Sequence, residues 1–386
     1  MEAPTPNRST SWLARPLSRR QLLYRSAQVA GLASLGGLAA CGGSDSEGEP
    51  AATGGGTGAA APEELSGTIT MMNYPGWMGE NEVANFEKTN PDVTVKQVEG
   101  LTTGAAAAVT QIQQNLGSYD MSLGGLVVGG QLEAADLIQE VDKANIPNLQ
   151  AVPPYFVETY GWGIPTDYGK VGFGYRKDLM SEQPESWADV WELAPKYSKK
   201  IVFVNYDVDI LGAALLYKGY DVNSTDEAEL EEAKDALIEI KPHLLAFVST
   251  DIIKPMLQGT AVLTVDYDYD IAVAQKRNEN VVWVSPAEGT PAYLDGWLAI
   301  KETDNLPEVE AFMNHHLDPE IYADFINTTG SAYILPDAEP FIDASIKENP
   351  SLAYDEEAVQ RIAWEEFLGA EATKLRSQIW EEVKAA

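Results

Sequence analysis

The sequence predicts an α/β protein built from two similar halves, each a mostly parallel sheet flanked by helices. Two observations predict this fold class. Strand-like and helix-like runs alternate over residues 68–137, and the same alternation starts again near Trp162. Such alternation produces parallel strands whose two faces are covered by helices. The chain has 386 residues and many aromatic side chains, so it can form more than one hydrophobic core.

In the first half, each expected strand is followed by an expected helix. The expected strands are residues 68–74, 93–98 and a short one from 119, and the expected helices are 82–88, 105–116 and 131–137. Ligands of such sheets bind beyond the carboxyl ends of the strands. Asn73, Tyr74 and Trp77 follow the first strand and Gly124-Gly125 follows the third, so we expect part of a binding site there.

The second half repeats this pattern. Its expected strands are residues 171–175, 201–204 and 261–265, and its expected helices are 186–191, 210–218 and 227–240. Ser186 is expected to cap the first of these helices, and Ser224 and Glu227 have the spacing of a capping box. From about Asp355 onwards, apolar stripes indicate a helical C-terminus.

The run Asp266-Tyr267-Asp268-Tyr269-Asp270 has two interpretations. In an extended chain it places three carboxylates on one face and two tyrosines on the other. Like charges that close together need a cation or plentiful water. Alternatively, Asp268 or Asp270 caps the helix that follows, where the helix dipole favours an anion. Both interpretations stay open, and they can hold for different residues of the run.

Tyr293 and Asp295 lie in the stretch 291–297, between strand candidates at 281–284 and 297–300. We expect this stretch to be a loop. If the loop joins two lobes, the aromatic ring and the carboxylate lie where the lobes meet, and both suit an organic cation. An ordinary surface turn at the Asp-Gly dipeptide explains the same residues.

Charge and composition exclude several functions. The formal net charge of -33 at pH 7 argues against nucleic acid, because phosphate binding needs clustered lysine and arginine. The single cysteine excludes an intrachain disulfide, and the three histidines have no metal-ligand spacing with a cysteine, so we expect no metal and no cofactor. An extracellular hydrolase that uses paired acids is a remote alternative, since no Ser-His-Asp set and no G-x-S-x-G motif is visible.

The first 40 residues are typical of an export signal. Ser18-Arg19-Arg20-Gln21-Leu22-Leu23 is a twin-arginine motif. The weakly hydrophobic run at 27–40 is shorter than the about 20 apolar residues that span a membrane. Leu38-Ala39-Ala40-Cys41-Gly42 resembles a lipoprotein processing box, with the acceptor thiol directly after the cleavage site. We therefore expect residues 1–40 to be a twin-arginine lipoprotein signal peptide.

Cys41 is the expected site of lipidation. Residues 41–66 are rich in glycine and alanine and are expected to be a flexible tether, because such a composition buries too little apolar area to order itself. The body that follows is expected to be soluble and extracytoplasmic. The lipid would anchor it to the outer face of the cell membrane.

Several stretches of the body occur in an order that is typical of one family. These are Asn73-Tyr74 and residues 119–121, 163–165, 172–174, 186–191, 218–220, 223–226 and 293–300. From about residue 67 to the C-terminus, the chain resembles the extracellular solute-binding proteins of ABC importers, in their spermidine/putrescine branch. The resemblance implies a two-lobed, periplasmic-binding-protein-like (type II) fold with the ligand cleft between the lobes.

The resemblance also implies that the chain crosses between the lobes more than once. We expect crossings near residues 163–166, 291–295 and 331–336. Lobe 1 then comprises residues 67–163 and 295–333, and lobe 2 comprises residues 164–294 and 334–386.

In this family, aromatic rings line the cleft and carboxylates bind the ammonium groups of the ligand. The resemblance assigns these ligand-binding roles to Tyr74, Trp77, Asp209, Tyr267, Tyr293 and Asp295. Three places depart from the family pattern. Gly124-Gly125 replaces a serine and a tyrosine, Tyr206 replaces an aspartate, and Ser331 replaces a tyrosine.

The function implied is that of a monomeric substrate-binding component of an ABC importer. It would capture a small organic cation, a polyamine such as spermidine or putrescine, and deliver it to a membrane permease and its ATPase. The alternative is a binding protein of the same fold for another amine, an amino-acid derivative or a sugar. Rings and carboxylates also suit sugar hydroxyls, so the residue types alone leave this choice open.

Overall fold

The computed structural model describes residues 64–99, 105–353, 359 and 362–386. The chain divides into two units, and all of these residues belong to the unit of residues 62–386. The expected signal peptide, the lipid acceptor Cys41 and the tether as far as residue 63 lie outside the described residues.

The described strands form one sheet whose main order is β2-β1-β3-β10-β5-β8-β6-β7. Four further strands pair at its sides, β4 and β12 with β10, and β9 and β11 with β5. The strands are β1 (Gly67–Asn73), β2 (Val93–Glu99), β3 (Met121–Leu123), β4 (Ile138–Gln139), β5 (Ile164–Arg176), β6 (Ile201–Val204), β7 (Leu244–Val248), β8 (Leu263–Tyr267), β9 (Val281–Val284), β10 (Pro291–Ile300), β11 (Ala332–Tyr333) and β12 (Ala363–Trp364).

Two parallel groups of strands flank an antiparallel centre. At one end β1 pairs in parallel with β2 and β3, and at the other end β6 pairs in parallel with β7 and β8. Between them, β10 runs antiparallel to β3 and β5, and β5 runs antiparallel to β8. The expected mostly parallel strands are confirmed in each half, and two antiparallel strands join the halves.

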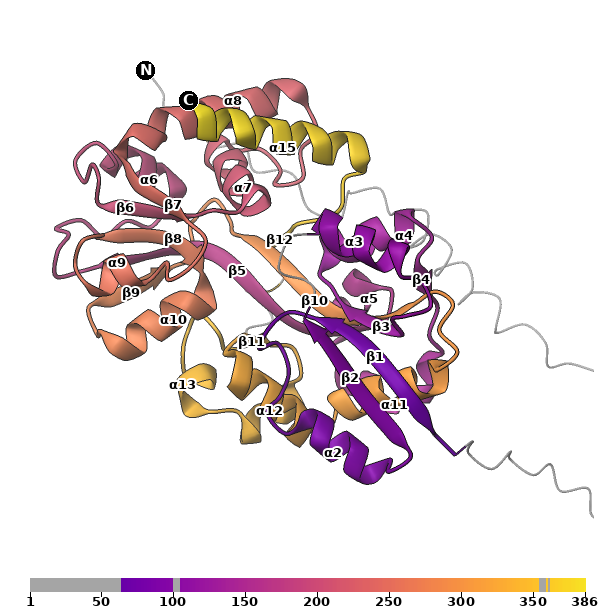
Figure 1. Ribbon diagram of the computed structural model, residues 1–386. Helices are drawn as coiled ribbons and strands as arrows, with labels where there is room; N and C mark the ends of the chain where they lie inside the picture. The colour runs from indigo at the N-terminus through magenta and orange to yellow at the C-terminus, as the bar shows by residue number, and fades with distance from the viewer. Residues whose placement is uncertain (1–63, 100–104, 354–358, 360–361) are drawn as a thin grey trace, which may run out of the picture. The chain divides into compact units, whose positions relative to one another are not determined.

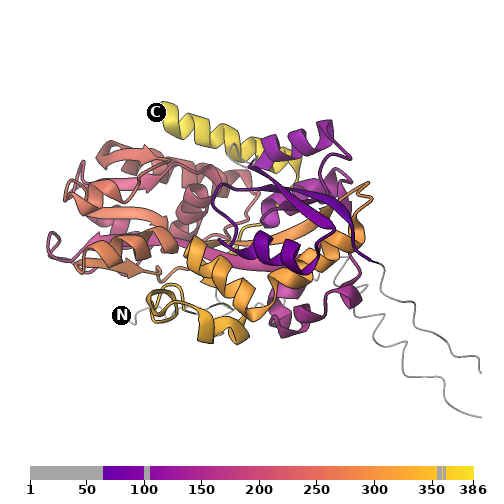
Figure 2. The same cartoon turned by 60° about the horizontal axis from the view of Figure 1, so that its bottom comes forward.

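These two strands, β5 and β10, are the structural link between the halves. Figure 1 shows them side by side in the middle of the molecule, and Figure 2 shows them from a second direction. All 13 residues of β5 are buried. Its first part pairs with β10 and β11, and its last part, residues 171–176, pairs with β8 and β9. The sequence predicted only 171–175 of this strand, because the polar residues before it conceal a segment buried on both faces.

Helices cover the sheet. Those of seven or more residues are α2 (Glu82–Thr89), α3 (Ala105–Gln114), α4 (Leu126–Ala134), α5 (Pro154–Tyr160), α6 (Trp187–Leu193), α7 (Asp207–Lys218), α8 (Glu227–Ile240), α10 (Asp268–Arg277), α11 (Leu306–His316), α12 (Pro319–Thr329) and α15 (Ala370–Ala385). The C-terminal α15 lies along α8 in Figure 1. Within the described ranges, no helix has the length and apolar character that a membrane crossing needs.

The described residues contain two hydrophobic cores, one in each half. Ile334, Leu335, Ile346 and Leu352 pack in the first core, although the sequence analysis assigned residues 334–386 to lobe 2. In that C-terminal region, the buried residues of the second core are Ile379, Trp380 and Val383, all on α15. We therefore propose that residues 334–353 belong to lobe 1, which leaves α15 as the C-terminal contribution to lobe 2.

Of the starts of α4, α6 and α8, one agrees with the prediction and two differ from it. Ser186 caps α6 as expected, in a capping box with Asp189. Asp226 rather than Ser224 caps α8, because its carboxylate accepts from the backbone N–H groups of both Ala228 and Glu229. Helix α4 starts directly after Gly125, earlier than the expected 131–137, because the residues after that glycine are apolar and mostly buried.

The expected loop at 291–297 is wrong. This stretch belongs to the ten-residue strand β10, and Pro291 is its first residue, a position where the missing N–H of proline is tolerated. The Asp295-Gly296 dipeptide makes a shift in the pairing register with β5 instead of a turn. The side chains on both faces of β10 are buried, so the strand lacks the alternation of a surface strand.

The C-terminal region is only partly the expected helix. Residues 354–358 lie outside the described residues. Ala363–Trp364 forms β12. In the next residue, the N–H of Glu365 donates a hydrogen bond to the carbonyl of Ala292. The stripe of Leu375, Ile379 and Val383 is confirmed as one face of α15 packed on the second core.

Candidate functional site

Two buried carboxyl groups face each other at the link between the halves. Asp167 on β5 and Asp295 on β10 are direct cross-strand partners, and they are 0% and 8% exposed. Like charges at such positions repel. Burial and then the charge of Asp167 raise the pKa of Asp295 well above its usual range. This pair needs a proton or an external cation to balance its charge.

The surroundings of Asp167 supply hydrogen-bond donors. Thr166 donates from Oγ1 to Asp167 Oδ1 at 2.8 Å, while Oδ2 has no hydrogen-bond partner among the described residues. Burial raises the pKa of Asp167 to about 6, although bonds from Thr166 and Ser331 act to lower it. The indole of Trp77 lowers the same pKa, although its N–H makes no hydrogen bond of good geometry. Ser331 replaces the family's tyrosine, so this departure places a hydroxyl near an unexpected acid.

Gly125, the other departure, makes room for Asp295. A Cβ atom at Gly125 would lie 2.8 Å from Asp295 Oδ1, so any larger residue would displace the carboxylate. Gly125 is also the residue that precedes the first turn of α4. The carboxylate therefore lies at the start of a helix, where the dipole favours negative charge.

A row of four aromatic rings runs beside this pair. The rings of Trp77 and Tyr269 meet edge-on at 5.8 Å, those of Tyr269 and Tyr267 stack at 5.4 Å with 10° between planes, and those of Tyr267 and Tyr293 meet edge-on at 5.9 Å. The Tyr293 ring occupies the space that a side chain at Gly169 would fill, since a Cβ there would lie 2.5 Å from its hydroxyl. Aromatic rings attract cations through their π faces, so a row of rings beside buried acids suits a cation.

A second carboxyl pair lies at the other side of these rings. Asp209, in the first turn of α7, is 2% exposed and accepts a 2.6 Å hydrogen bond from the hydroxyl of Tyr267. Burial raises the pKa of Asp209 to about 7, although bonds from Tyr267 and from the side chain of Glu365 lower it. The side chain of Glu365 therefore lies next to that of Asp209, and two carboxyl groups hydrogen-bond only with a proton between them.

Glu365 reaches this pair from the segment after β12 and is 4% exposed. Burial and then the charge of Asp209 raise the pKa of Glu365 well above its usual range, and Arg376 on α15 lowers it. Its Oε1 atom has no hydrogen-bond partner in the described part of the chain. Arg376 donates to the carbonyl of Val222, and its other terminal nitrogen, Nη2, is buried and unpaired.

Tyr74 completes the site from the first half. It follows β1, and burial and then the charge of Asp295 raise its pKa. The Asn73 side chain fixes the turn that carries it, because Nδ2 donates to the carbonyl of Trp77 at 2.6 Å. Tyr206, the third departure, lies near enough to interact electrostatically with both Tyr74 and Asp209.

Neither interpretation of the Asp266–Asp270 run holds in full. The strand β8 ends at Tyr267 and α10 begins at Asp268, so the run is not extended throughout. Asp268 and Asp270 lie in the first turn, where the dipole favours them, but no side chain caps this helix. Asp268 has Lys170 at 3.7 Å, whereas both carboxylate oxygens of the buried Asp266 lack a partner among the described residues.

The site therefore contains more buried acid than base. Its carboxyl groups are those of Asp167, Asp209, Asp266, Asp268, Asp270, Asp295 and Glu365. The cations that act on them are Lys170 at Asp268 and Arg376 at Glu365. A search of the described residues finds no group of three or more side chains arranged to hold a metal ion. The arrangement suits an organic cation with aromatic contacts.

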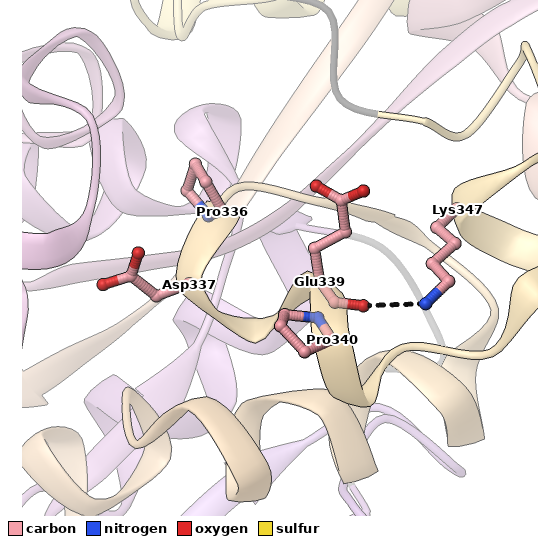
Figure 3. Close-up of a pocket in the computed structure, with 5 residues that line it drawn as sticks. All are labelled: Pro336, Asp337, Glu339, Pro340 and Lys347. Carbon is pink, nitrogen blue, oxygen red and sulfur yellow. Dashed lines mark hydrogen bonds between the residues drawn. The ribbon is translucent and has the colours of Figure 1, made fainter.

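A separate surface hollow of about 400 Å³ lies away from these acids. Figure 3 shows its lining residues, Pro336, Asp337, Glu339, Pro340 and Lys347. The ammonium of Lys347 already donates to the carbonyl oxygen of Glu339 at 3.2 Å, and the carboxylates of Asp337 and Glu339 are on exposed residues. Because none of its polar groups is both buried and unpaired, we do not assign the ligand to this hollow.

The structure brings together all six residues to which the resemblance assigned ligand contacts. These are Tyr74, Trp77, Asp209, Tyr267, Tyr293 and Asp295. It adds Asp167, Tyr269 and Glu365, which the sequence analysis did not assign. Asp167 gave little signal, because it stands among polar residues of β5 that the sequence did not predict as a strand. Glu365 gave no signal, because only the tertiary fold brings it to Asp209.

Comparisons with known proteins agree with this fold. The profile of the bacterial extracellular solute-binding proteins matches residues 82–354. Putrescine-binding periplasmic protein SpuD of Pseudomonas aeruginosa (strain UCBPP-PA14) is 25% identical over 337 residues, which cover 82% of this chain and 92% of SpuD.

Two solved structures are similar to this one. The spermidine/putrescine ABC transporter substrate-binding protein PotD of Streptococcus pneumoniae matches with a TM-score of 0.73 at 23% identity, covering 83% of this chain and 99% of PotD. The TpPotD lipoprotein of Treponema pallidum matches with a TM-score of 0.68 at 21% identity, covering 82% and 99%. These likenesses confirm the expected two-lobed α/β fold.

Proposed function

Because this chain belongs to the bacterial extracellular solute-binding protein family, we propose that it captures a polyamine such as spermidine or putrescine for an ABC importer. Its relative SpuD is named for putrescine binding, and the similar PotD belongs to a spermidine/putrescine transporter. The family consists of proteins that bind solutes, so we place the chain among binding proteins and not among enzymes.

The observation that carries this proposal is the surplus of buried, unpaired carboxyl groups around a row of rings. Unpaired acids such as Asp266 and Asp167 are costly unless a cation reaches them. Each charge-assisted hydrogen bond contributes roughly 1.5–3 kcal/mol net, and each desolvated cation–π contact up to about 2 kcal/mol. Two carboxylates and two or three rings therefore supply the roughly 8 kcal/mol of micromolar affinity, if ordering costs stay small.

A ligand panel tests the proposal. Isothermal titration calorimetry of the full chain with spermidine, spermine and putrescine should give micromolar or tighter binding, and glucose and glutamate should give none. Glutamate carries carboxylates that the acids of the site repel, and glucose offers no charge to balance them. Binding of glucose with indifference to all three polyamines would show a sugar-binding protein of the same fold.

We further propose that the protein works outside the cytoplasm, tethered through a lipid on Cys41, as the partner of a membrane permease and its ATPase. The likeness to the TpPotD lipoprotein supports this location, and the processing box around Cys41 supports the anchor. More than one acyl chain is needed for stable anchoring, and a diacylated, N-acylated cysteine supplies them. In cells, Cys41→Ser should move the protein from the membrane fraction to the medium, and continued membrane association contradicts the anchor.

A further inference from the structure

The two carboxyl pairs of the site share one feature. Each contains an acid that the resemblance assigned to the ligand, Asp295 in one pair and Asp209 in the other. Each also contains a second acid that the resemblance did not assign, Asp167 beside Asp295 and Glu365 beside Asp209. Both second acids have one buried oxygen with no hydrogen-bond partner among the described residues. The second acids therefore need a function of their own.

Side chains from several elements interact electrostatically or by hydrogen bonds with the first pair. On Asp167 and Asp295 these are Thr166, Ser331, Trp77, His316, Tyr74, Tyr160, Tyr293 and Tyr322. The hydroxyls and the indole are neutral donors. His316 Nδ1 is 2.7 Å from Glu82 Oε1, so its partner is that carboxylate. No lysine or arginine is among the groups that act on this pair in the described residues, so its second negative charge has no fixed counter-ion.

The second pair has one fixed cation for two acids. The groups that act on Asp209 and Glu365 are Tyr267, Asp207, Arg376, Tyr206, Asp266 and Tyr269. Arg376 offsets one negative charge of the pair, and the nearby carboxyl groups of Asp207 and Asp266 add further negative charge. The side chains of Asp209 and Glu365 are both buried and lie next to each other, and two carboxyl groups hydrogen-bond only with a proton between them.

Two buried carboxyl groups in contact cannot both ionise without a cation, so they hold one proton as a unit. We propose that Asp167 and Glu365 give each of two ammonium subsites a second carboxyl group, so that each pair holds one proton when empty and releases it to solvent when an ammonium group binds. This inference rests on the proposed function, because the ligand must bring the positive charge. An ammonium group has three donors and bridges two carboxylates, so it replaces the shared proton in both position and charge.

Proton release makes affinity depend on pH. Burial raises the pKa of Asp167 to about 6 and that of Asp209 to about 7, so the pairs are protonated when empty in mildly acidic solution. Below these values, each released proton lowers the affinity about tenfold for every unit that the pH falls. Two pairs acting together make the dependence up to about a hundredfold per unit. A polyamine would bind tightly near neutral pH and be released in acid.

The test counts protons. Spermidine is titrated into the full chain at pH 6 in several buffers of different ionisation enthalpy, and the slope of the observed heat gives the protons released. The wild type should release about one to two protons per spermidine bound. Asp167→Asn and Glu365→Gln, which keep shape but cannot share a proton, should each reduce that number by about one and flatten the pH dependence. Asp337→Asn on the exposed hollow is the matched control and should change neither.

Each outcome decides the question. Spermidine binding with no proton release, or variants that release as many protons as the wild type, overturns the inference and leaves the proposed function in place. Absence of binding of spermidine, spermine and putrescine at any pH instead rejects the proposed function. In that case a readout without ligand still decides the proton sharing: urea unfolding should show the wild type losing stability from about pH 4 to about pH 7, and less so in Asp167→Asn. Equal pH profiles would overturn it.

Discussion

The molecule contains two groups of buried acids that differ in their hydrogen-bond partners. The acids of the scaffold, Glu82, Asp120 and Glu310, each accept at least two bonds. Asp120 accepts from the Thr70 N–H at 2.7 Å, Thr303 Oγ1 at 2.6 Å and Asn305 Nδ2 at 2.9 Å. Glu82 accepts from the Gly79 N–H at 3.1 Å and contacts His316 at 2.7 Å. Glu310 accepts from Asp142 N–H at 2.6 Å and Asn145 Nδ2 at 2.7 Å.

The acids of the cleft lack such partners. Both oxygens of Asp266, one of Asp167 and one of Glu365 are buried and unpaired within the described residues. The fold thus satisfies each scaffold acid with donors from its own chain, and leaves buried oxygens of the cleft acids unpaired. Burial of an unpaired acid costs free energy that no folding requirement explains, so the difference marks the cleft acids as functional. Substitutions in the two groups should therefore have opposite signatures.

The largest effect on binding is expected at Asp295. Asp295→Ala removes a carboxylate from the site and should weaken spermidine binding about a hundredfold, because a charge-assisted hydrogen bond is lost. The measurement is calorimetry at pH 7.5, with Asp337→Asn as the control that leaves affinity unchanged. Unaltered affinity in Asp295→Ala would remove this residue from the site. It would also end the distinction between cleft and scaffold acids.

The scaffold acid Asp120 should show the reverse pattern. Asp120→Asn places an amide donor against three donors of the chain and should lower the free energy of unfolding by about 2–3 kcal/mol. The spermidine affinity of the folded protein should stay within about twofold, since Asp120 is not among the groups that act on the cleft acids. Urea unfolding and calorimetry measure the two quantities. A large loss of affinity without loss of stability would contradict the assignment of Asp120 to the scaffold.

Asp167→Asn is expected to stabilise the ligand-free protein. The pKa of Asp167 in the fold, about 6, lies above that of the unfolded chain, so folding favours its protonated form. Stability is therefore lost as the pH rises from about 4 to about 6, and asparagine avoids that loss. The variant should be more stable than wild type by about 1–3 kcal/mol at pH 7 and by little at pH 4. Urea unfolding at both pH values checks this, and a gain of equal size at pH 4 would contradict it.

The fold class could be predicted from the sequence because alternating strands and helices are local patterns. The strand at 201–204 and the cap at Ser186 were predicted at their observed residues. Of β10, only residues 297–300 were predicted as a strand, because Asp295 and Gly296 carry turn chemistry and only pairing with β5 makes them extended. At these residues the pairing of strands in the fold overrides the local preference for a turn.

Prediction from the sequence had the same limit at the candidate site. Residues such as Asp295 and Asp209 followed from a resemblance of linear motifs. The role of Asp167 could not be inferred in this way, because it depends on the strand register that places Asp167 opposite Asp295. Nor could the role of Glu365, because a bond from its N–H to the carbonyl of Ala292 brings the C-terminal segment to β10. Contacts that depend on strand register or on distant segments are absent from a single sequence.

The smallest effect concerns a third kind of acid, partly exposed and well bonded. Asp189 accepts from the backbone N–H groups of Glu185 and Ser186 and from the Ser186 hydroxyl, at 2.8, 3.0 and 2.7 Å. Desolvation raises its pKa, but these bonds outweigh it, so the pKa lies below its usual value. Asp189→Asn should lower the free energy of unfolding by about 0.5–1 kcal/mol at pH 7, as loss of a capping box does.

The pH dependence of this loss has the opposite sign to that of Asp167. A carboxyl with a depressed pKa stabilises the fold above its unfolded pKa, and that contribution disappears as the pH falls through the folded pKa. The difference in stability between wild type and Asp189→Asn should therefore shrink below about pH 4, while that of Asp167→Asn grows above it. Measuring both variants by urea unfolding over the same pH range separates an acid whose charge the fold uses from one whose charge it leaves to a ligand. If the two profiles had the same sign, the unpaired acids of the cleft would be ordinary parts of the scaffold.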